Sequence, residues 1–324
     1  MALLALPASN AGSDIQLDWL ELRAFFDEYS NARLDELTGG RRTLEEEQAE
    51  DIGEFDQGDD AFRADIEDEL NNRKTALGPA YPFDLSQDGE EVVMITQADT
   101  VGACFYLLCL IASHITDSPI LNAPPDGEIL ARFRNRIYQI MGTLAVAGRV
   151  NGPSVSVGYP RQTKETILDV LRRAERWGLG LTPREKPGKH AQPRAKDGGI
   201  DVIGWSPGYR EPPFTIVFAQ LASGNNWVGK PASVEYDNFM NDFFEDRGTN
   251  QHSFVTLIPF RITDELKWRR ESSIHKHICD RCSAPRHAFD GFSLSATGTN
   301  MDEVENVGVL TAWIAEYRAF ALAA

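Results

Sequence analysis

The sequence predicts an α/β protein in which a mixed central sheet, flanked by helices, follows an acidic all-helical N-terminal domain. Residues 1–120 carry 26 Asp and Glu against 7 Lys and Arg, and their apolar residues recur mostly at helical spacing. Beyond residue 120, helical segments alternate with β-prone ones. Two β-prone segments follow each other with only a turn between them, which a strictly parallel sheet does not allow. We therefore expect two domains, residues 1–120 and residues 121–324.

Helical segments account for most of the N-terminal domain. The stretch over 14–29, "DIQLDWLELRAFFDEY", places its apolar residues on one helical face, and the helical section over 43–77 opens with "TLEEE", a typical helix start. The run over 101–115, "VGACFYLLCLIASHI", is apolar throughout. It is shorter than the roughly 20 residues that a membrane span requires, so it predicts a buried helix.

The second domain alternates between helix and strand. The β-prone runs "GGIDVIGW" and "PFTIVFAQL" are rich in β-branched and aromatic residues, and "SPGYREPP" supplies the turn between them. The other expected elements are a helix over 126–146, a strand over 154–160, a helix over 163–177, a strand over 253–260 and a closing helix over 307–324.

Charge and cysteine content limit the classes of function. The net charge of −17 argues against a protein that coats nucleic acid over its whole surface, but residues 121–230 carry 16 Lys and Arg against 9 Asp and Glu. Four cysteines in a chain of this length do not make a disulfide framework, which indicates the reducing cytoplasm. We expect no membrane association.

Polar residues gather at the ends of the two adjacent predicted strands. Asp201 lies in the first strand, Gln220 near the end of the second, and Lys230 shortly after it. Because paired strands lie about 5 Å apart, these groups converge on one place. Mg²⁺ prefers carboxylate oxygens with waters and phosphate oxygens, and a lysine stabilises charge on a phosphate. Such a site suits phosphodiester hydrolysis.

These residues resemble the PD-(D/E)XK nuclease superfamily, whose fold is restriction-endonuclease-like, over about residues 125–235. "KDGGIDVIGW" is similar to the "GDGGIDV" strand of the Mrr-like branch, whose metal-binding aspartate matches Asp201. "FAQL" is similar to the next strand, which has Glu or Gln, one residue, and then Lys. Gln220 matches the first position, but Ala222 stands where the family has lysine, so Lys230 is expected to supply the amine.

The resemblance also implies a second oxygen ligand for the metal. Related nucleases often carry a Phe-Glu pair in the first helix, whereas this chain has Phe133 followed by Arg134. Glu128 one or two turns earlier, or Glu165 in the next helix, is a candidate substitute. Asp197 is close enough in sequence to Asp201 to contribute as well.

The function that the resemblance implies is a Mg²⁺- or Mn²⁺-dependent deoxyribonuclease. Stand-alone nucleases of this kind resemble effectors of bacterial defence against phage or foreign DNA. The acidic N-terminal domain is then expected to hold the nuclease off DNA or to dock a partner such as a motor ATPase. Nuclease domains often dimerise, so a homo-oligomer stays open.

A basic segment precedes the predicted site. The stretch "PREKPGKHAQPRAK" over 183–196 is rich in proline and charge, and it is expected to neutralise phosphates of a bound nucleic acid or to be a solvated flexible loop. Its basic residues are Arg184, Lys186, Lys189, Arg194 and Lys196.

Two alternatives to an active nuclease remain. The altered positions 134 and 222 also suit a nuclease fold whose site has decayed and which serves as a nucleic-acid-binding or assembly scaffold. "HKHICDRCSAPRH" over 275–287 offers zinc ligands in His275, His277, Cys279 and Cys282, but a second Cys pair is missing. A helix with Ile278 and Cys282 on its apolar face and Asp280 and Arg281 outward is the favoured interpretation of this segment.

Overall fold

Internal contacts divide the chain into two units. The structure, a computed structural model, describes residues 3–8, 10–39, 53–116, 118–158, 161, 165–189, 191 and 198–323, with the backbone alone over 53–59. The first unit comprises residues 1–126 and 314–324, and the second comprises residues 127–313. The sequence-based boundary lies near residue 120 and leaves the C-terminal residues in the second domain, whereas by contacts they group with the first unit.

The first unit combines helices with a small sheet. Its elements are α1 (Ser13–Phe26), β1 (Asn31–Arg33), α3 (Gly53–Leu77), the 3₁₀ turn η1 (Gly78–Ala80), β2 (Phe83–Leu85), β3 (Glu91–Met94), α4 (Val101–Ser113) and the end of α11 (Val307–Ala323). The strands form an antiparallel sheet in the order β1-β3-β2. The expectation of an all-helical domain is therefore wrong, because strands of three or four residues are too short to show a clear alternation in the sequence.

The core of the first unit forms around α4. Every residue from Gly102 to Ala112 is buried, which confirms the predicted buried helix. A helix that is apolar on all sides has no face for water and must be covered on all sides by other elements. Nowhere in the described ranges does a helix combine the length and the apolar character that crossing a membrane requires.

The second unit contains the larger sheet. Its elements are α5 (Gly127–Arg132), the π-helical turn η2 (Phe133–Ile137), α6 (Tyr138–Val150), β4 (Ser154–Ser156), α7 (Ile167–Arg176), β5 (Val202–Trp205), β6 (Thr215–Leu221), the 3₁₀ turn η3 (Asn225–Gly229), α8 (Ala232–Phe243), β7 (Gln251–Leu257), α9 (Glu265–His275), β8 (Ile278–Cys279), α10 (Ala284–Ser295), the 3₁₀ turn η4 (Val304–Asn306) and the start of α11.

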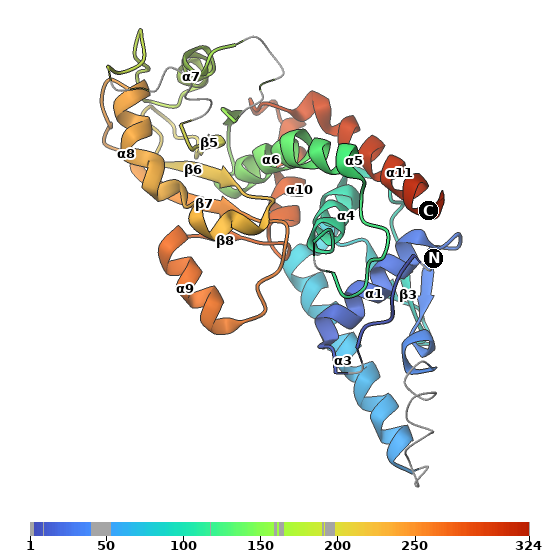
Figure 1. Ribbon diagram of the computed structural model, residues 1–324. Coiled ribbons are helices and arrows are strands. Elements are labelled where there is room, and N and C mark those ends of the chain that lie inside the picture. The colour runs from blue at the N-terminus through green and yellow to red at the C-terminus, as the bar shows by residue number, and fades with distance from the viewer. Residues whose placement is uncertain are drawn as a thin grey trace. The chain divides into compact units, whose positions relative to one another are not determined.

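The sheet of the second unit has the order β4-β5-β6-β7-β8, of which Figure 1 labels β5 to β8. β4, β5 and β6 pair antiparallel, whereas β7 and β8 are parallel to β6 because α8 and α9 return the chain to the starting edge. The predicted mixed sheet is thus confirmed. Of its strands, β8 was not predicted, and neither were α8, α9 and α10 as separate helices.

Helices cover both faces of this sheet. On one face, small residues admit α6: a Cβ placed on Gly142 would lie 2.5 Å from Leu221, and one on Gly204 would lie 2.6 Å from Val146. On the other face, Trp205 and Phe218 pack into an apolar core with residues of α7 and α8. The residues described next lie at the end of the sheet where β5 begins and β6 and β7 end.

Candidate active site at the end of the mixed sheet

Asp201 stands directly before β5 and is 8% exposed. The chain reaches it through Gly198 and Gly199, whose φ values of 62° and 79° favour glycine. The backbone N–H of Asp201 donates to the carbonyl of Ala219 at 2.9 Å, which continues the pairing between β5 and β6. The aspartate is therefore held at a strand end by main-chain hydrogen bonds.

Gln220 meets Asp201 across the strand pair. The Gln220 side-chain amide donates to Asp201 Oδ2, and the Leu221 backbone N–H donates to the same oxygen at 2.7 Å. Two donors fix the orientation of the carboxylate. The structure thus brings together two of the residues that the sequence singled out, Asp201 and Gln220.

Helix α6 reaches this place through Gln139, which the sequence analysis missed. Its Nε2 donates to the carbonyl oxygen of Asp201 at 3.0 Å and to Ser156 Oγ at 2.9 Å. The resemblance led us to expect an acid beside Phe133, but the residue at that position is Arg134, which is exposed. A glutamine two turns further along the helix carries no signal that separates it from an ordinary surface residue.

Two of the three proposed second metal ligands, Glu128 and Glu165, are described, and the structure does not place either of them in a hydrogen bond with Asp201. Glu128 is exposed on α5, and the Glu165 carboxylate is paired with Arg173. Asp197 lies outside the described residues. A carboxylate that was not predicted packs against the glycine pair before Asp201: a Cβ on Gly199 would be 2.4 Å from Glu235 Cγ of α8. Its helix was missed, and so was the residue.

Lys230 follows η3 and is exposed. Its backbone N–H donates to the carbonyl of Trp227 at 3.0 Å. Its ammonium group forms no hydrogen bond or ion pair with the described residues. Ala222, at the position where the family has lysine, is 3% exposed and packs in a small apolar cluster with Trp227, Ile258 and Ile278. The described structure therefore has no direct contact between the Lys230 side chain and Asp201.

The basic segment is partly anchored. Arg184 donates through its backbone to the carbonyl of Phe243 at 2.9 Å and through Nε to that of Asn241 at 3.1 Å, so its guanidinium group is engaged at the end of α8. Lys186 and Lys189 are exposed, whereas Arg194 and Lys196 lie outside the described residues. The expectation of a wholly solvated loop is wrong for 183–189, because main-chain bonds to α8 hold it.

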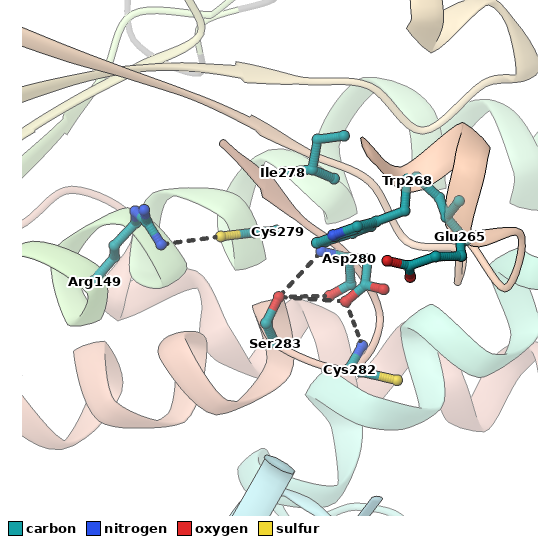
Figure 2. Close-up of a pocket in the computed structure, with 9 residues that line it drawn as sticks. Arg149, Glu265, Trp268, Ile278, Cys279, Asp280, Cys282 and Ser283 are labelled. Atoms are coloured by element: carbon teal, nitrogen blue, oxygen red, sulfur yellow. Dashed lines mark hydrogen bonds between the residues drawn. The ribbon is translucent and has the colours of Figure 1, made fainter. Parts of the chain in front are cut away.

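The Cys-x-x-Cys segment lines a pocket of about 420 Å³ (Figure 2). Arg149 Nη1 donates to Cys279 Sγ at 3.6 Å, and Figure 2 shows the Cys282 sulfur directed away from this pair. Among the described residues, which include all of 275–287, no three His, Cys, Asp or Glu side chains are arranged to hold a metal ion. The zinc alternative has no support in this geometry.

The favoured helical interpretation of the same segment is also wrong. Ile278 and Cys279 form β8, and α10 begins only at Ala284. Asp280 and Arg281, expected outward, are 8% and 2% exposed, because pairing with β7 draws this turn inward. Burial raises the pKa of Asp280 and of the Cys279 thiol.

The fold and the site together define an α/β protein with a buried aspartate, bonded to a half-buried glutamine, at the end of a mixed sheet. Comparison with known proteins adds no family to this description: no family model, no curated protein and no solved structure matches the chain. The function must be argued from the residues themselves.

Proposed function

We propose that the protein is a metal-dependent nuclease that hydrolyses phosphodiester bonds of DNA. The observation that carries the proposal is the contact between Asp201 and Gln220 on adjacent strands. It lies at the carboxyl ends of the parallel strands β6 and β7, where open α/β sheets place their ligands. A carboxylate and an amide at this edge are the hard oxygen donors that Mg²⁺ or Mn²⁺ takes.

Each residue has a distinct role in this proposal. Asp201 holds the metal ion together with water and phosphate oxygens, and the ion supplies Lewis-acid stabilisation of the phosphate when it is bound. Gln220 orients the carboxylate through its N–H and offers its carbonyl oxygen to the attacking water. Lys230 stabilises negative charge on the phosphate, and Glu235, which packs against Gly199, and Asp197 are the candidates for a further carboxylate ligand.

The charge distribution supports DNA as substrate. Lys186 and Lys189 are exposed beside α8 and suit contacts to phosphates, together with Arg184, Arg194 and Lys196 in the same segment. We place the activity in the cytoplasm, in defence against phage or foreign DNA.

The first unit presents acidic side chains as a control surface. Asp65, Glu67 and Asp68 are exposed on α3, and they suit docking of a basic partner such as a motor ATPase or repulsion of DNA. Reversing these three charges to lysine should raise DNA affinity at low salt. Unchanged affinity and cleavage in that variant would count against a role in restraining the nuclease.

A second candidate function is a nuclease-fold subunit that no longer cleaves and serves as a scaffold in a nucleic-acid complex. The burial of Ala222 in an apolar cluster favours it, because that position leaves no room for the lysine of the family pattern. So does the exposed position of Lys230.

Cleavage of supercoiled plasmid and linear DNA with Mg²⁺ or Mn²⁺ decides between the two. Wild type is compared with Asp201→Asn and Lys230→Ala, and the matched controls are Asp237→Asn and Lys267→Ala, which change an exposed aspartate and an exposed lysine of the same unit. We expect metal-dependent cleavage that falls at least roughly 100-fold in the first pair and stays unchanged in the controls.

Three results would contradict the nuclease proposal. Equal cleavage by all variants would place the activity elsewhere or in a contaminant. Metal-independent DNA binding by wild type without cleavage would favour the scaffold. Loss of cleavage together with loss of folding, seen by circular dichroism, would assign Asp201 a structural role.

A further inference from the structure

We propose that His275 is a positioning residue that couples the strand end bearing Gln220 to the turn bearing Lys230. The role of His275 in cleavage rests on the proposed nuclease function, whereas the contacts of His275 are observed in the structure. It addresses a gap in the site, because Lys230 makes no direct contact with Asp201 and needs some other connection to it.

A row of buried and half-buried polar side chains crosses the sheet beside the site. Asp201 precedes β5, Gln220 lies on β6, and Thr256 on β7 is the register partner of Gln220. Register partners on paired strands point to the same face, so the three side chains lie in one line. Thr256 has no solvent exposure. A hydroxyl in that position requires a hydrogen-bonding partner.

His275 is that partner. Its Nδ1 lies 2.7 Å from Thr256 Oγ1, and the side chain, at the end of α9, is fully buried. The next residue, Lys276, has φ 69° and ψ −53°, a strained γ-turn conformation for a residue with a side chain. The chain therefore leaves α9 in a costly conformation immediately after placing the imidazole on the row.

The other face of the imidazole packs on η3. The rings of His275 and Trp227 have centroids 5.1 Å apart and planes tilted by 44°. Trp227 is 4% exposed, and its carbonyl accepts the backbone N–H of Lys230 at 3.0 Å. His275 thus touches both the sheet end and the turn from which Lys230 projects.

The small residue Ala222 makes this arrangement possible. Ala222 and Trp227 share one apolar cluster, so the indole occupies space beside the strand end that a lysine at 222 would need. An alanine at 222 and the position of the turn that ends at Lys230 therefore depend on each other. The imidazole against Trp227 fixes where that turn lies.

The contacts of His275 with Thr256 and Trp227, called the His275 joint below, leave some hydrogen-bonding groups without partners. His275 Nε2 and Glu271 Oε2 are buried without a hydrogen-bond partner and lie 3.9 Å apart. Buried polar atoms are nearly always satisfied, and exceptions concentrate where a functional constraint holds them. Burial lowers the pKa of His275, against the opposing effects of the Val228 backbone and the Glu271 carboxylate, so the imidazole is neutral at neutral pH.

The test probes the His275 joint through Trp227 fluorescence and Lys230 labelling, without relying on DNA cleavage. Trp227 fluorescence, taken as the difference between wild type and Trp227→Phe, is titrated from pH 7.5 to pH 4.5, because a protonated imidazole against an indole quenches it. Labelling of Lys230 by an amine-reactive ester is followed in parallel by mass spectrometry, with Lys267 as the internal reference. Both are repeated in His275→Gln, His275→Asn and the control His287→Gln.

We expect the Trp227 titration to vanish in His275→Gln and persist in His287→Gln. The Lys230 labelling rate should change at least threefold in His275→Gln, with partial recovery in His275→Asn. In the cleavage assay His275→Gln should lower kcat at least tenfold with little change in KM for DNA. A titration that persists without His275, or a Lys230 labelling rate that does not respond, would overturn the inference. Absence of cleavage in wild type would instead contradict the proposed function and leave these two readouts intact.

Discussion

Each unit of the molecule buries a cluster of polar side chains, and the two clusters differ in how completely they are satisfied. In the first unit Arg73 is 2% exposed and bonds Asp18 at 2.7 Å, Glu21 at 2.9 Å and Glu69 at 2.8 Å. Tyr106 and Tyr81 donate to the Glu21 carboxylate. Among these side chains no buried polar atom lacks a hydrogen bond.

The row in the second unit is incomplete. Gln220 bonds Asp201, and Thr256, the register partner of Gln220 on β7, bonds His275, but His275 Nε2 and Glu271 Oε2 remain without hydrogen-bond partners. It also lies at the sheet end, whereas the Arg73 cluster is enclosed. The Arg73 cluster is closed on itself, whereas the row in the second unit keeps two buried polar atoms without hydrogen bonds, an exception that requires an explanation. Whether charged groups are buried does not by itself distinguish the Arg73 cluster from the row in the second unit.

Removing the centre of the closed network should have the largest effect. In Arg73→Met three carboxylates lose their cation in a buried place, which should destabilise the first unit by about 3–5 kcal/mol. Hydrogen exchange of peptides from α1 and α4 would measure it. Lys74→Met, one residue on, breaks a half-exposed pair with Asp84 and should cost roughly 1 kcal/mol or less. Equal protection in both variants would remove the distinction between the clusters.

Changing Gln220 to glutamate should sharpen the comparison. Gln220→Glu replaces the donor to Asp201 with a second carboxylate, and the repulsion should lower stability by about 1–3 kcal/mol without metal. Mg²⁺ between the two carboxylates should restore it, so thermal denaturation with and without Mg²⁺ should show a larger metal-dependent rise in Tm than wild type. A rise equal to that of wild type would argue against a cation at this place.

Acid should affect the two units with opposite sign. Burial lowers the pKa of several second-unit histidines below the ordinary 6.5, so the unfolded chain binds more protons and stability falls as pH drops from 6.5 through the lowered values. They are His252, His275, His277 and His287.

Glu21 in the first unit behaves in the opposite way. Its pKa is raised from 4.5 mainly by burial, so its contribution is lost as pH rises through the raised value. Asp280 and Asp302, with raised pKa values, oppose the histidines at more acidic pH. Hydrogen exchange at pH 7.0 and 5.8, corrected for intrinsic rates, should show protection lost in the second unit by less than about 1 kcal/mol for each buried histidine with a lowered pKa, and less so in His275→Gln. Uniform loss in both units would contradict this.

The smallest effect on stability is expected in the basic segment. Lys186→Ala with Lys189→Ala should leave the free energy of unfolding within about 0.5 kcal/mol of wild type, because both side chains are exposed. If they contact phosphates, the slope of log affinity for DNA against log salt should become shallower by about 2. Fluorescence anisotropy with a labelled duplex at several salt concentrations measures it, and an unchanged slope would leave DNA contacts to other residues.

The sequence was sufficient where local pattern and pairing coincide. Asp201 and Gln220 sit in β-prone runs joined by a turn, and antiparallel neighbours of that kind pair with each other, so their contact could be predicted. The buried helix α4 could also be predicted, because its composition admits no exposed face.

Features that depend on pairing between distant segments could not be predicted. Thr256 and His275 meet because β7 lies parallel to β6 and α9 returns beside it, and neither residue carries a local signal. Residues 278–282 were interpreted as helix because their apolar spacing suits one, yet pairing with β7 makes Ile278 and Cys279 a strand. Tertiary context overrides local preference in short segments.

The wide separation of the row along the chain has a consequence for synthesis. Its members are gathered by a parallel strand pair that forms only after α8 has closed the connection between β6 and β7, and its last member is residue 275. Non-local parallel pairing is among the slow steps of folding. The growing chain therefore holds Asp201 and Gln220 long before it can complete the row, and a site that requires all four residues stays inert until most of the second unit has left the ribosome.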